Sequence, residues 1–556
     1  MSSATPHRLP LAGVLRLGRP SGIWFKPALS VVAAAAPPNL TLLALGRLDL
    51  AMYTMAGSLC ALYGHSRPYA ARARALAWVV LGMVGGLALS LVAASLTTNA
   101  VVLVTVGALM AAVQKVLCDA TRIGPPAHVI PTFVTSAALF APQTLGQVPA
   151  HTGLALAAGA WAWLVGMAPG LLRPYGPERR ATAQALNAAA AYAATRGTGE
   201  GRARARAAAA AAVQAAWQSL LSARVDPTRR SLERFVVRAE VALAAPADTD
   251  PGALRTWARA LRGTGRVPRA DLPVEADAEL LGVDAELALL HRPLWRGLGP
   301  LAPIAARTAL GCALAGYASL ALGVGRPYWA LVTAASLYQA NLTLTWSRGV
   351  QRVVGNLVGV LVFAVIAPLA HLHPAALVLC CLAFNFGAEA LIGRNYWLGS
   401  ICVTPMALLI TEFARTQDAG ELITDRVADT LVGALVGFVA AAAVTNRRAG
   451  DRIEHALGAV EKAREHAARL LAEPQPAPRA LESARRALAA ALADLRATTD
   501  AASGEWWQRA LPQERVVLAE RSGHRTLAAT ARRQGLHSWA GQGTAQTTAT
   551  TEDVRP

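Results

Sequence analysis

The sequence predicts an all-α polytopic membrane protein with two six-helix membrane halves, each followed by a helical cytoplasmic region. Charge is distributed very unevenly along the 556 residues. Residues 1–172 and 301–445 contain 17 Lys and Arg and 8 Asp and Glu, whereas residues 173–300 and 446–556 contain 36 and 26. The low-charge blocks divide into apolar stretches close to the length of a spanning helix, about 20 residues. The charged blocks are rich in Ala and Arg, which favour helix.

Each low-charge block divides into six predicted spans. In the N-terminal membrane half, residues 1–172, we expect them near 27–45, 50–64, 76–96, 98–117, 128–146 and 152–172. In the C-terminal membrane half, residues 301–445, we expect them near 303–323, 327–341, 353–371, 374–392, 396–413 and 427–445. Twelve spans, arranged as six plus six, fit the pattern best.

The charged blocks are expected to form helical cytoplasmic domains. In the first domain, residues 173–300, helices are predicted at 181–194, 202–223 and 227–244. In the second, residues 446–535, they are predicted at 452–472, 479–498 and 513–533. The Thr-, Gln- and Gly-rich tail, residues 536–556, has the composition of a disordered segment.

The basic residues predict the orientation of the chain in the membrane. Cytoplasmic loops carry an excess of Lys and Arg. With the N-terminus inside, only Arg47 falls in an outer loop of the first half, and the inner loops contain Arg67, Arg72, Arg74, Lys115 and Arg122. The second half shows no such bias, but an even number of spans in each half places both charged blocks in the cytoplasm. The net charge of +19 therefore mainly reflects orientation in a lipid bilayer.

Several classes of function are disfavoured. Lys and Arg nearly balance Asp and Glu in each charged block (19 against 13, and 17 against 13), so we expect no nucleic-acid partner. The chain has no Walker-type phosphate-binding motif. Its six cysteines show no metal-ligand spacing, so neither a cofactor nor a metal is expected. A membrane enzyme would need catalytic loops, and the predicted outer loops offer few candidates beyond Asp49, His151, His371 and His373, so we expect that the protein is not an enzyme.

The second half contains an internal repeat. Residues Arg352 to Gly359 read RVVGNLVG, and residues Arg426 to Gly433, 74 positions later, read RVADTLVG. A Tyr-Trp pair precedes each copy, at Tyr328-Trp329 and Tyr396-Trp397. The paired segments begin spans of opposite direction, which is the pattern of an inverted three-plus-three repeat. Chance similarity between Leu-, Val- and Gly-rich helices is the alternative.

These motifs resemble a known family. The run from Gly325 through Tyr328-Trp329 to Gly359, and the closing Arg426, Asp429, Thr430 and Gly433, are similar to the core of the fusaric acid resistance and aromatic acid exporter superfamily. The first half matches only in layout. The resemblance implies a bacterial inner-membrane exporter of aromatic carboxylic acids or related small organic anions, driven by the proton gradient. A passive anion channel and a non-transporting membrane scaffold are alternatives, and a homo-oligomer is compatible with the sequence.

Ionisable residues inside spans are the first candidates for function, because an unpaired charge in lipid is costly. Glu389, near Asn385, is interpreted either as a proton-coupling carboxylate or as the partner of Arg394 or Lys115 in a structural ion pair. Lys115 and Glu389 occupy corresponding positions in the fourth span of each half. Asp119, four residues after Lys115, is expected to neutralise it.

The remaining candidates lie in the repeat. Arg348 and Arg352, at the inner mouth, are expected either to attract a carboxylate or to act as ordinary positive-inside anchors. Arg426 and Asp429 are interpreted first as an intrahelical pair and second as a gate. Tyr328 and Trp329 are expected to be interfacial anchors or to stack on an aromatic substrate. The small-residue pairs predict close helix packing at Gly355, Gly359, Gly433 and Gly437.

Overall fold

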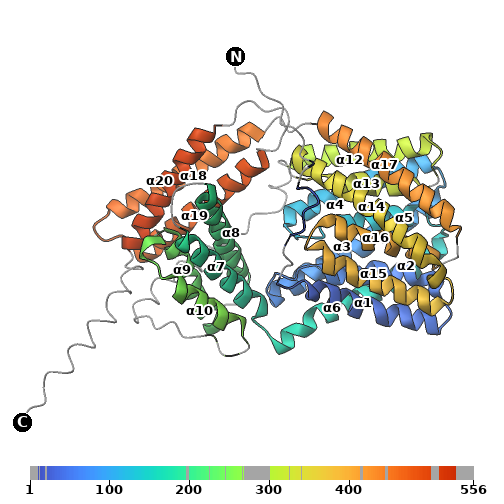
Figure 1. The fold of residues 1–556 in the computed structure, drawn as a ribbon, viewed down its shortest axis with the longest axis horizontal. Coiled ribbons are helices and arrows are strands. Elements are labelled where there is room, and N and C mark those ends of the chain that lie inside the picture. The colour runs from blue at the N-terminus through green and yellow to red at the C-terminus, as the bar shows by residue number, and fades with distance from the viewer. Residues whose placement is uncertain are drawn as a thin grey trace, which may run out of the picture.

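The fold consists of two helical lobes (Figure 1). The computed structural model describes residues 11–195, 200–267, 301–444, 449–502 and 512–533, apart from 12, 19–21, 224–225, 245, 264, 266, 325, 340 and 414–416. All regular secondary structure in these residues is helical, which confirms the all-α prediction for this part of the chain. One lobe contains the low-charge blocks and is called the membrane lobe. The other contains the charged blocks and is called the charged lobe.

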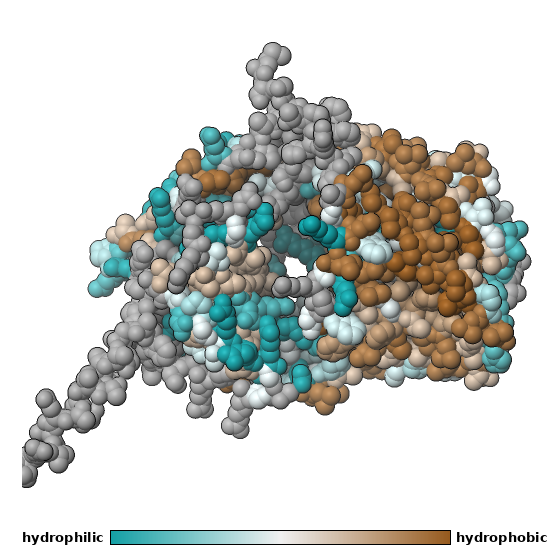
Figure 2. Space-filling view, viewed as in Figure 1, coloured by the Kyte–Doolittle hydropathy of each residue, from teal (hydrophilic) through white to brown (hydrophobic). Residues whose placement is uncertain are grey.

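The membrane lobe is built around long apolar helices. Eight helices of the described chain are long and apolar enough to cross a membrane. They are α1 (Phe25–Ala44), α3 (Tyr69–Leu96), α4 (Ala100–Thr121), α6 (Val148–Leu172), α12 (Ala302–Ala321), α14 (Leu342–Ala370), α15 (Pro374–Ile392) and α17 (Ala419–Ala443). Large apolar side chains such as Trp78, Leu361 and Val365 are exposed on their outer faces. Figure 2 shows a broad apolar area on the face of the lobe in view, as expected for contact with lipid.

The other four predicted spans are shorter helices. They are α2 (Ala51–Ser58), α5 (Val129–Leu139), α13 (Pro327–Leu337) and α16 (Tyr396–Glu412). Their lengths do not confirm the predicted total of twelve spans. Every residue of α13 is buried, and a helix surrounded by protein need not match the thickness of the bilayer. The predicted span at 128–146 is too long, because α5 ends at Leu139, three residues before Pro142.

Helix packing in the membrane lobe follows one pattern in both halves. In the C-terminal half α14 packs on α16 and α17 packs on α13. In the N-terminal half α3 packs on α5 and α6 packs on α2. Each half thus consists of two groups of three helices: α1 to α3 and α4 to α6 in the first half, and α12 to α14 and α15 to α17 in the second. In both halves the third helix of one group packs against the second helix of the other group. The two halves meet where α4 packs on α12 and α1 packs on α15, a pair of contacts related by exchanging the halves.

The charged lobe combines helices from both charged blocks. The first block supplies α7 (Gly176–Ala194), α8 (Glu200–Leu221), α9 (Pro227–Ala244) and α10 (Pro251–Arg262). The second supplies α18 (Ala449–Ala472), α19 (Pro478–Ala502) and α20 (Gln513–Arg533). The blocks meet where α19 packs on α8 and α20 on α9. Arg485 Nη1 lies 2.6 Å from Glu240 Oε2 across this contact, and Arg486 lies over the Trp217 ring at 4.1 Å.

The sequence analysis missed helix α10, although its signals are present. The Asp250 side chain accepts hydrogen bonds from the backbone N–H groups of Gly252 and Ala253. Such a cap, followed by Pro at the first helical position, is a typical helix start. Leu254, Ala258 and Leu261 then form its buried face. The predicted disordered tail, 536–556, lies outside the described residues.

Candidate functional site

The internal repeat brings Arg352 to the second Tyr-Trp pair. Arg352 is buried on α14, and its Nη1 donates a 3.0 Å hydrogen bond to Tyr396 Oη. Arg348, one turn earlier, lies over the ring of the same tyrosine, with Cζ 3.9 Å from the centroid. Such cation–π contacts hold a guanidinium without neutralising its charge. Two cations of α14 therefore share one aromatic residue at the start of α16.

Arg426 forms the corresponding contact with the first Tyr-Trp pair. It lies on α17 with its Cζ 3.8 Å above the Trp329 ring. Arg426 is only 1% exposed, and its Nε and Nη1 donate no hydrogen bond. Tyr328 and Trp329 are also buried, so the interpretation as interfacial anchors is wrong for this pair. The Tyr328 ring stacks instead on Phe140, which follows α5, and the Trp329 ring stacks on Phe133 of α5, in the other half of the lobe.

A layer of hydrogen bonds lies between the two arginine clusters. Asn356 Nδ2 donates to Thr430 Oγ1 at 2.9 Å. Thr404 Oγ1 donates to Asn356 Oδ1 at 2.7 Å. All three residues are buried, and they join α14, α16 and α17 near the middle of each helix. Buried polar groups that satisfy one another in this way fix the relative position of the helices.

Glycines allow these helices to approach closely. A Cβ at Gly355 would lie 2.6 Å from the Trp397 carbonyl oxygen, and one at Gly359 would lie 2.7 Å from Thr404 Cβ. A Cβ at Gly433 would collide with the Ala330 carbonyl oxygen, and one at Gly437 would lie 3.0 Å from Ala334 Cβ. The first pair lies between α14 and α16, and the second between α17 and α13. Both glycine pairs therefore lie where a helix of one copy of the repeat packs against a helix of the other copy.

The buried site carries unbalanced positive charge. None of Arg348, Arg352 and Arg426 forms an ion pair within the described chain. Both the positive charge of Arg352 and the negative charge of Asp429 are close enough to act on Arg426. Asp429 accepts a 2.6 Å hydrogen bond from Ser319, and no ion pair joins it to Arg426. The expected intrahelical pair is therefore wrong, because Arg426 turns toward Trp329 instead.

The remaining sequence candidates lie elsewhere. Glu389, on α15, forms no ion pair with Arg394 or Lys115 among the described residues, so that interpretation is wrong. Lys115 is held by Asp119, with Nζ 2.8 Å from Oδ2, as expected from the four-residue spacing. Arg394 is exposed. The Asn385 side chain donates to the Cys381 carbonyl of its own helix, which satisfies it within α15.

The sequence analysis did not select Asn356, Thr404 or Ser319. The signal for Asn356 was available, because it lies inside the repeated motif at the position that Thr430 occupies in the second copy. Two polar residues at equivalent positions of two apolar helices indicate a contact across the axis of the repeat. No comparable pattern marks Ser319 or Thr404.

An N-terminal segment crosses the start of α16. Residues 13–18, called the strap, accept hydrogen bonds on their backbone carbonyls. The Val14 carbonyl accepts from Gln351 and Asn395, and the Leu15 carbonyl accepts from Trp397. The Gly18 N–H donates to the Arg394 carbonyl at 2.8 Å. The strap therefore binds the immediate chain neighbours of Arg352 and Tyr396.

The fold and this site define a multi-pass helical membrane protein with a buried, positively charged aromatic site. Residues 313–440 match a family model described as fusaric acid resistance protein-like. The match contains both arginine clusters and the layer between them, and it confirms the resemblance seen in the sequence of the C-terminal half. No curated protein and no solved structure matches the chain.

Proposed function

We propose that the protein is a secondary transporter of the bacterial inner membrane that exports aromatic carboxylic acids or related small organic anions. One observation carries this proposal: buried guanidinium groups that form no ion pair with any described residue lie against aromatic rings in the region that matches the family. An unpaired buried charge costs several kcal/mol. An anion bound beside Arg352 or Arg426 would remove that cost. A carboxylate suits the planar guanidinium donors.

The proposed substrate also has an aromatic body. Trp329, Tyr328 and Tyr396 supply rings at both arginine clusters, and offset stacking of aromatic rings is favourable. Arg352 lies toward the end of the lobe that joins the charged lobe, and Arg426 lies toward the opposite end. A substrate could therefore pass from one cluster to its equivalent. We also propose that the membrane lobe consists of two equivalent six-helix halves, because both show the same helix packing and meet through the α4–α12 and α1–α15 contacts.

The proposed orientation places the N-terminus and the charged lobe in the cytoplasm. Coupling to protons is assigned to Glu389, a carboxylate of α15 that forms no ion pair with any described residue, on a helix that packs on α1 of the other half. We propose no cofactor, no nucleic-acid partner and no enzymatic reaction; the partners are the substrate anion and the lipid bilayer.

Inside-out membrane vesicles test this function directly. Their lumen corresponds to the cell exterior and becomes acidic during respiration. A weak acid that crosses lipid passively is depleted from an acidic lumen, so its accumulation there requires coupled transport. We expect vesicles with the protein to accumulate radiolabelled aromatic acids. Equal uptake with and without the protein, across a broad panel of acids, would rule out the proposal.

Two substitutions distinguish the site from its surroundings. Arg426→Gln should reduce uptake at least tenfold, whereas Arg394→Gln, which changes an exposed arginine, should leave it unchanged.

Glu389→Gln separates a transporter from a passive channel. A channel would conduct the anion at the wild-type rate in this variant, and a proton-coupled transporter would lose accumulation.

A further inference from the structure

A cavity of about 610 Å³ lies at the end of the membrane lobe away from the charged lobe. Helix α17 ends at Ala443, shortly before α18 of the charged lobe begins at Ala449. The start of α17, at Ala419, therefore marks the end of the membrane lobe that lies away from the charged lobe. Segments of both halves line the cavity, namely the end of α1 with the residues up to Asp49, the end of α14, the start of α15 and the end of α16. In the proposed orientation the cavity faces the cell exterior.

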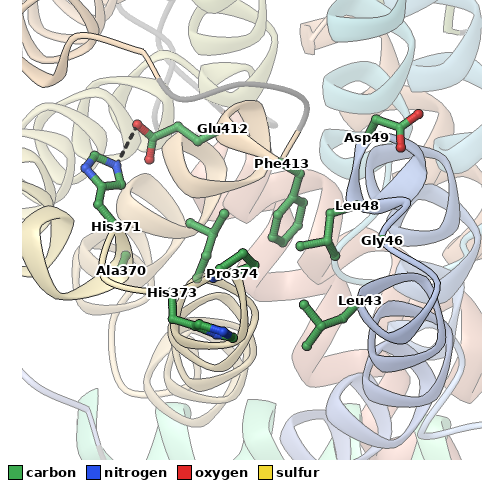
Figure 3. A pocket seen from close by; sticks show the side chains of 11 residues that line it. Leu43, Gly46, Leu48, Asp49, Ala370, His371, His373, Pro374, Glu412 and Phe413 are labelled. Carbon is green, nitrogen blue, oxygen red and sulfur yellow. Dashed lines mark hydrogen bonds and ion pairs between the residues drawn. The ribbon is translucent and has the colours of Figure 1, made fainter.

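A buried carboxylate forms part of the cavity wall. The Glu412 side chain is 0% exposed, and its Oε1 lies 3.0 Å from His371 Nε2. Its second oxygen, Oε2, accepts no hydrogen bond. The His371 side chain is 31% exposed, so it lies between Glu412 and solvent. Figure 3 shows the Glu412 carboxylate turned toward His371, with Leu48 and Phe413 farther along the cavity.

The other charged groups near the cavity are already occupied. Asp49 forms an ion pair with Arg47 at 3.1 Å. The His373 ring accepts a hydrogen bond from the Ala375 N–H and so caps α15. From the side of α13 and α17, Arg326 pairs with Asp425 at 3.4 Å. Within the described residues, His371 is therefore the one titratable group in ion-pair distance of Glu412.

The His371–Glu412 contact joins the far end of α16 to the residue that follows α14, and side-chain hydrogen bonds join the same two helices at two other levels. Arg352 and Tyr396 join these helices at the end near the charged lobe, and Asn356 and Thr404 join them in the middle. His371 and Glu412 join them at the far end. A change of charge at the far end therefore acts on the same helix pair that holds the proposed substrate site.

We propose that Glu412, reached through His371, is the external proton-binding site of the transporter. This inference rests on the proposed function. An external proton binds His371 Nδ1 while the Nε2 proton moves to Glu412 Oε1, which leaves a neutral imidazole and a neutral carboxyl group. Histidine is suited to such a relay. The transfer neutralises the Glu412 carboxylate in the cavity wall, and so removes its repulsion of a departing organic anion.

Glu412 and Glu389 would then serve opposite ends of one proton path. Glu412 ends α16 at the far end of the lobe, whereas Glu389 lies near the end of α15 closer to the charged lobe. The cavity carboxylate accepts the proton from outside. Glu389 would return it toward the cytoplasm.

The test compares Glu412→Gln and His371→Gln with His373→Asn in inside-out vesicles. His373→Asn changes the neighbouring histidine but keeps a side chain able to cap α15. Two rates are measured: accumulation of a labelled aromatic acid in an acidic lumen, and exchange of labelled for unlabelled acid at equal pH. Exchange requires the substrate site but no net proton movement.

We expect Glu412→Gln to lose accumulation at least tenfold while keeping exchange within about twofold of wild type. His371→Gln should slow accumulation, and His373→Asn should behave as wild type. Wild-type accumulation by Glu412→Gln would overturn the inference. Equal loss of accumulation and exchange would also overturn it, because the residue would then be structural. If wild type itself neither accumulates nor exchanges the acids, the proposed function fails first.

Discussion

Asn356 donates a 2.9 Å hydrogen bond to Thr430, the residue that occupies its own position in the second copy of the repeat, 74 residues later. A residue that contacts its own counterpart lies on the axis that relates the two copies. The motif that repeats along the sequence is therefore also a contact in space. The arginine clusters, at Arg352 and Arg426, lie on either side of this axis.

Removal of the axial hydrogen bonds should destabilise the membrane lobe. Asn356→Ala removes both of these hydrogen bonds between helices, so that Thr430 Oγ1 loses its donor and the Thr404 hydroxyl keeps the Ser400 carbonyl of its own helix as acceptor. We expect a loss of about 1–3 kcal/mol in the free energy of unfolding, measured as a lower midpoint of thermal unfolding in detergent. Asn385→Ala is the matched control, because that side chain bonds only within its own helix. Equal losses in both variants would contradict the axial role of Asn356.

The contact between α13 and α17 should not tolerate even one added methyl group. In Gly433→Ala the new Cβ would collide with the Ala330 carbonyl oxygen, so the helices must separate. Overpacking of this kind costs about 1–3 kcal/mol. Gly82→Ala, on α3, adds the same methyl group where no atom lies within 4 Å, and it should be neutral or slightly stabilising. Thermal unfolding of both variants measures the difference.

The two blocks of the charged lobe should depend on one buried arginine. Arg485 lies between two carboxylates. Its Nη1 is 2.6 Å from Oε2 of Glu240 in the first block, and its Nη2 is 2.6 Å from Oε1 of Glu482 on its own helix. Arg485→Ala leaves the buried Glu240 carboxylate without its cation, whereas Glu482 keeps Arg486 at 2.6 Å, and the change should cost about 3–5 kcal/mol. Arg464→Ala removes the more exposed pair with Glu461 and should cost less than about 1 kcal/mol. Chemical denaturation followed by tryptophan fluorescence tests both values.

Stability should also vary with pH through Glu178, near the start of α7. Burial raises the pKa of this carboxyl group to about 7, and its Oε2 accepts no hydrogen bond. The folded chain therefore holds a proton that the unfolded chain releases near pH 4.5, and this contribution to stability is lost as pH rises through 7. Relative to wild type, Glu178→Gln should gain on the order of 2–3 kcal/mol at pH 8 and little at pH 4. An identical pH profile in the two proteins would contradict this assignment.

The strap should protect the bond after Arg16 from trypsin. The side chain of Arg16 is exposed, but its carbonyl accepts a 2.9 Å hydrogen bond from Asn395. Asn395→Ala removes two of the hydrogen bonds that hold the strap, so cleavage after Arg16 should become several-fold faster. Inside-out vesicles expose the cytoplasmic face, and mass spectrometry of the released peptide measures the rate. Protection that persists in Asn395→Ala would show that other contacts hold the strap.

The large-scale organisation follows from composition, because a charge in lipid is costly and each block is uniform over more than 100 residues. Helix boundaries of the charged lobe were predicted to within a few residues wherever Pro or Gly interrupts an Ala-rich run, as at Pro227 and Pro478. Burial was not predictable in the same way. The residues of α13 have the composition of a lipid-facing helix, and it is internal because α4, α5, α12, α14 and α17 all pack around it.

Candidate residues were predicted less well than the fold, for a physical reason. Arg426 and Asp429 have the spacing of an ion pair, but a spacing of three residues does not show which neighbour each side chain contacts. Trp329 and Ser319 come from other helices and attract the two side chains separately. His371 and Glu412, which the sequence analysis did not pair, are separated by 41 residues and meet only because α14 and α16 lie against each other.

The joining of the two charged blocks has a consequence for the continuity of the polypeptide. A chain interrupted between residues 267 and 301 would yield two pieces, each with six of the membrane-lobe helices and part of the charged lobe. These pieces would retain two separate surfaces for each other: the α4–α12 and α1–α15 contacts in the membrane lobe, and the Arg485–Glu240 contact in the charged lobe. Two co-expressed polypeptides should therefore assemble into the same molecule without a covalent link between them.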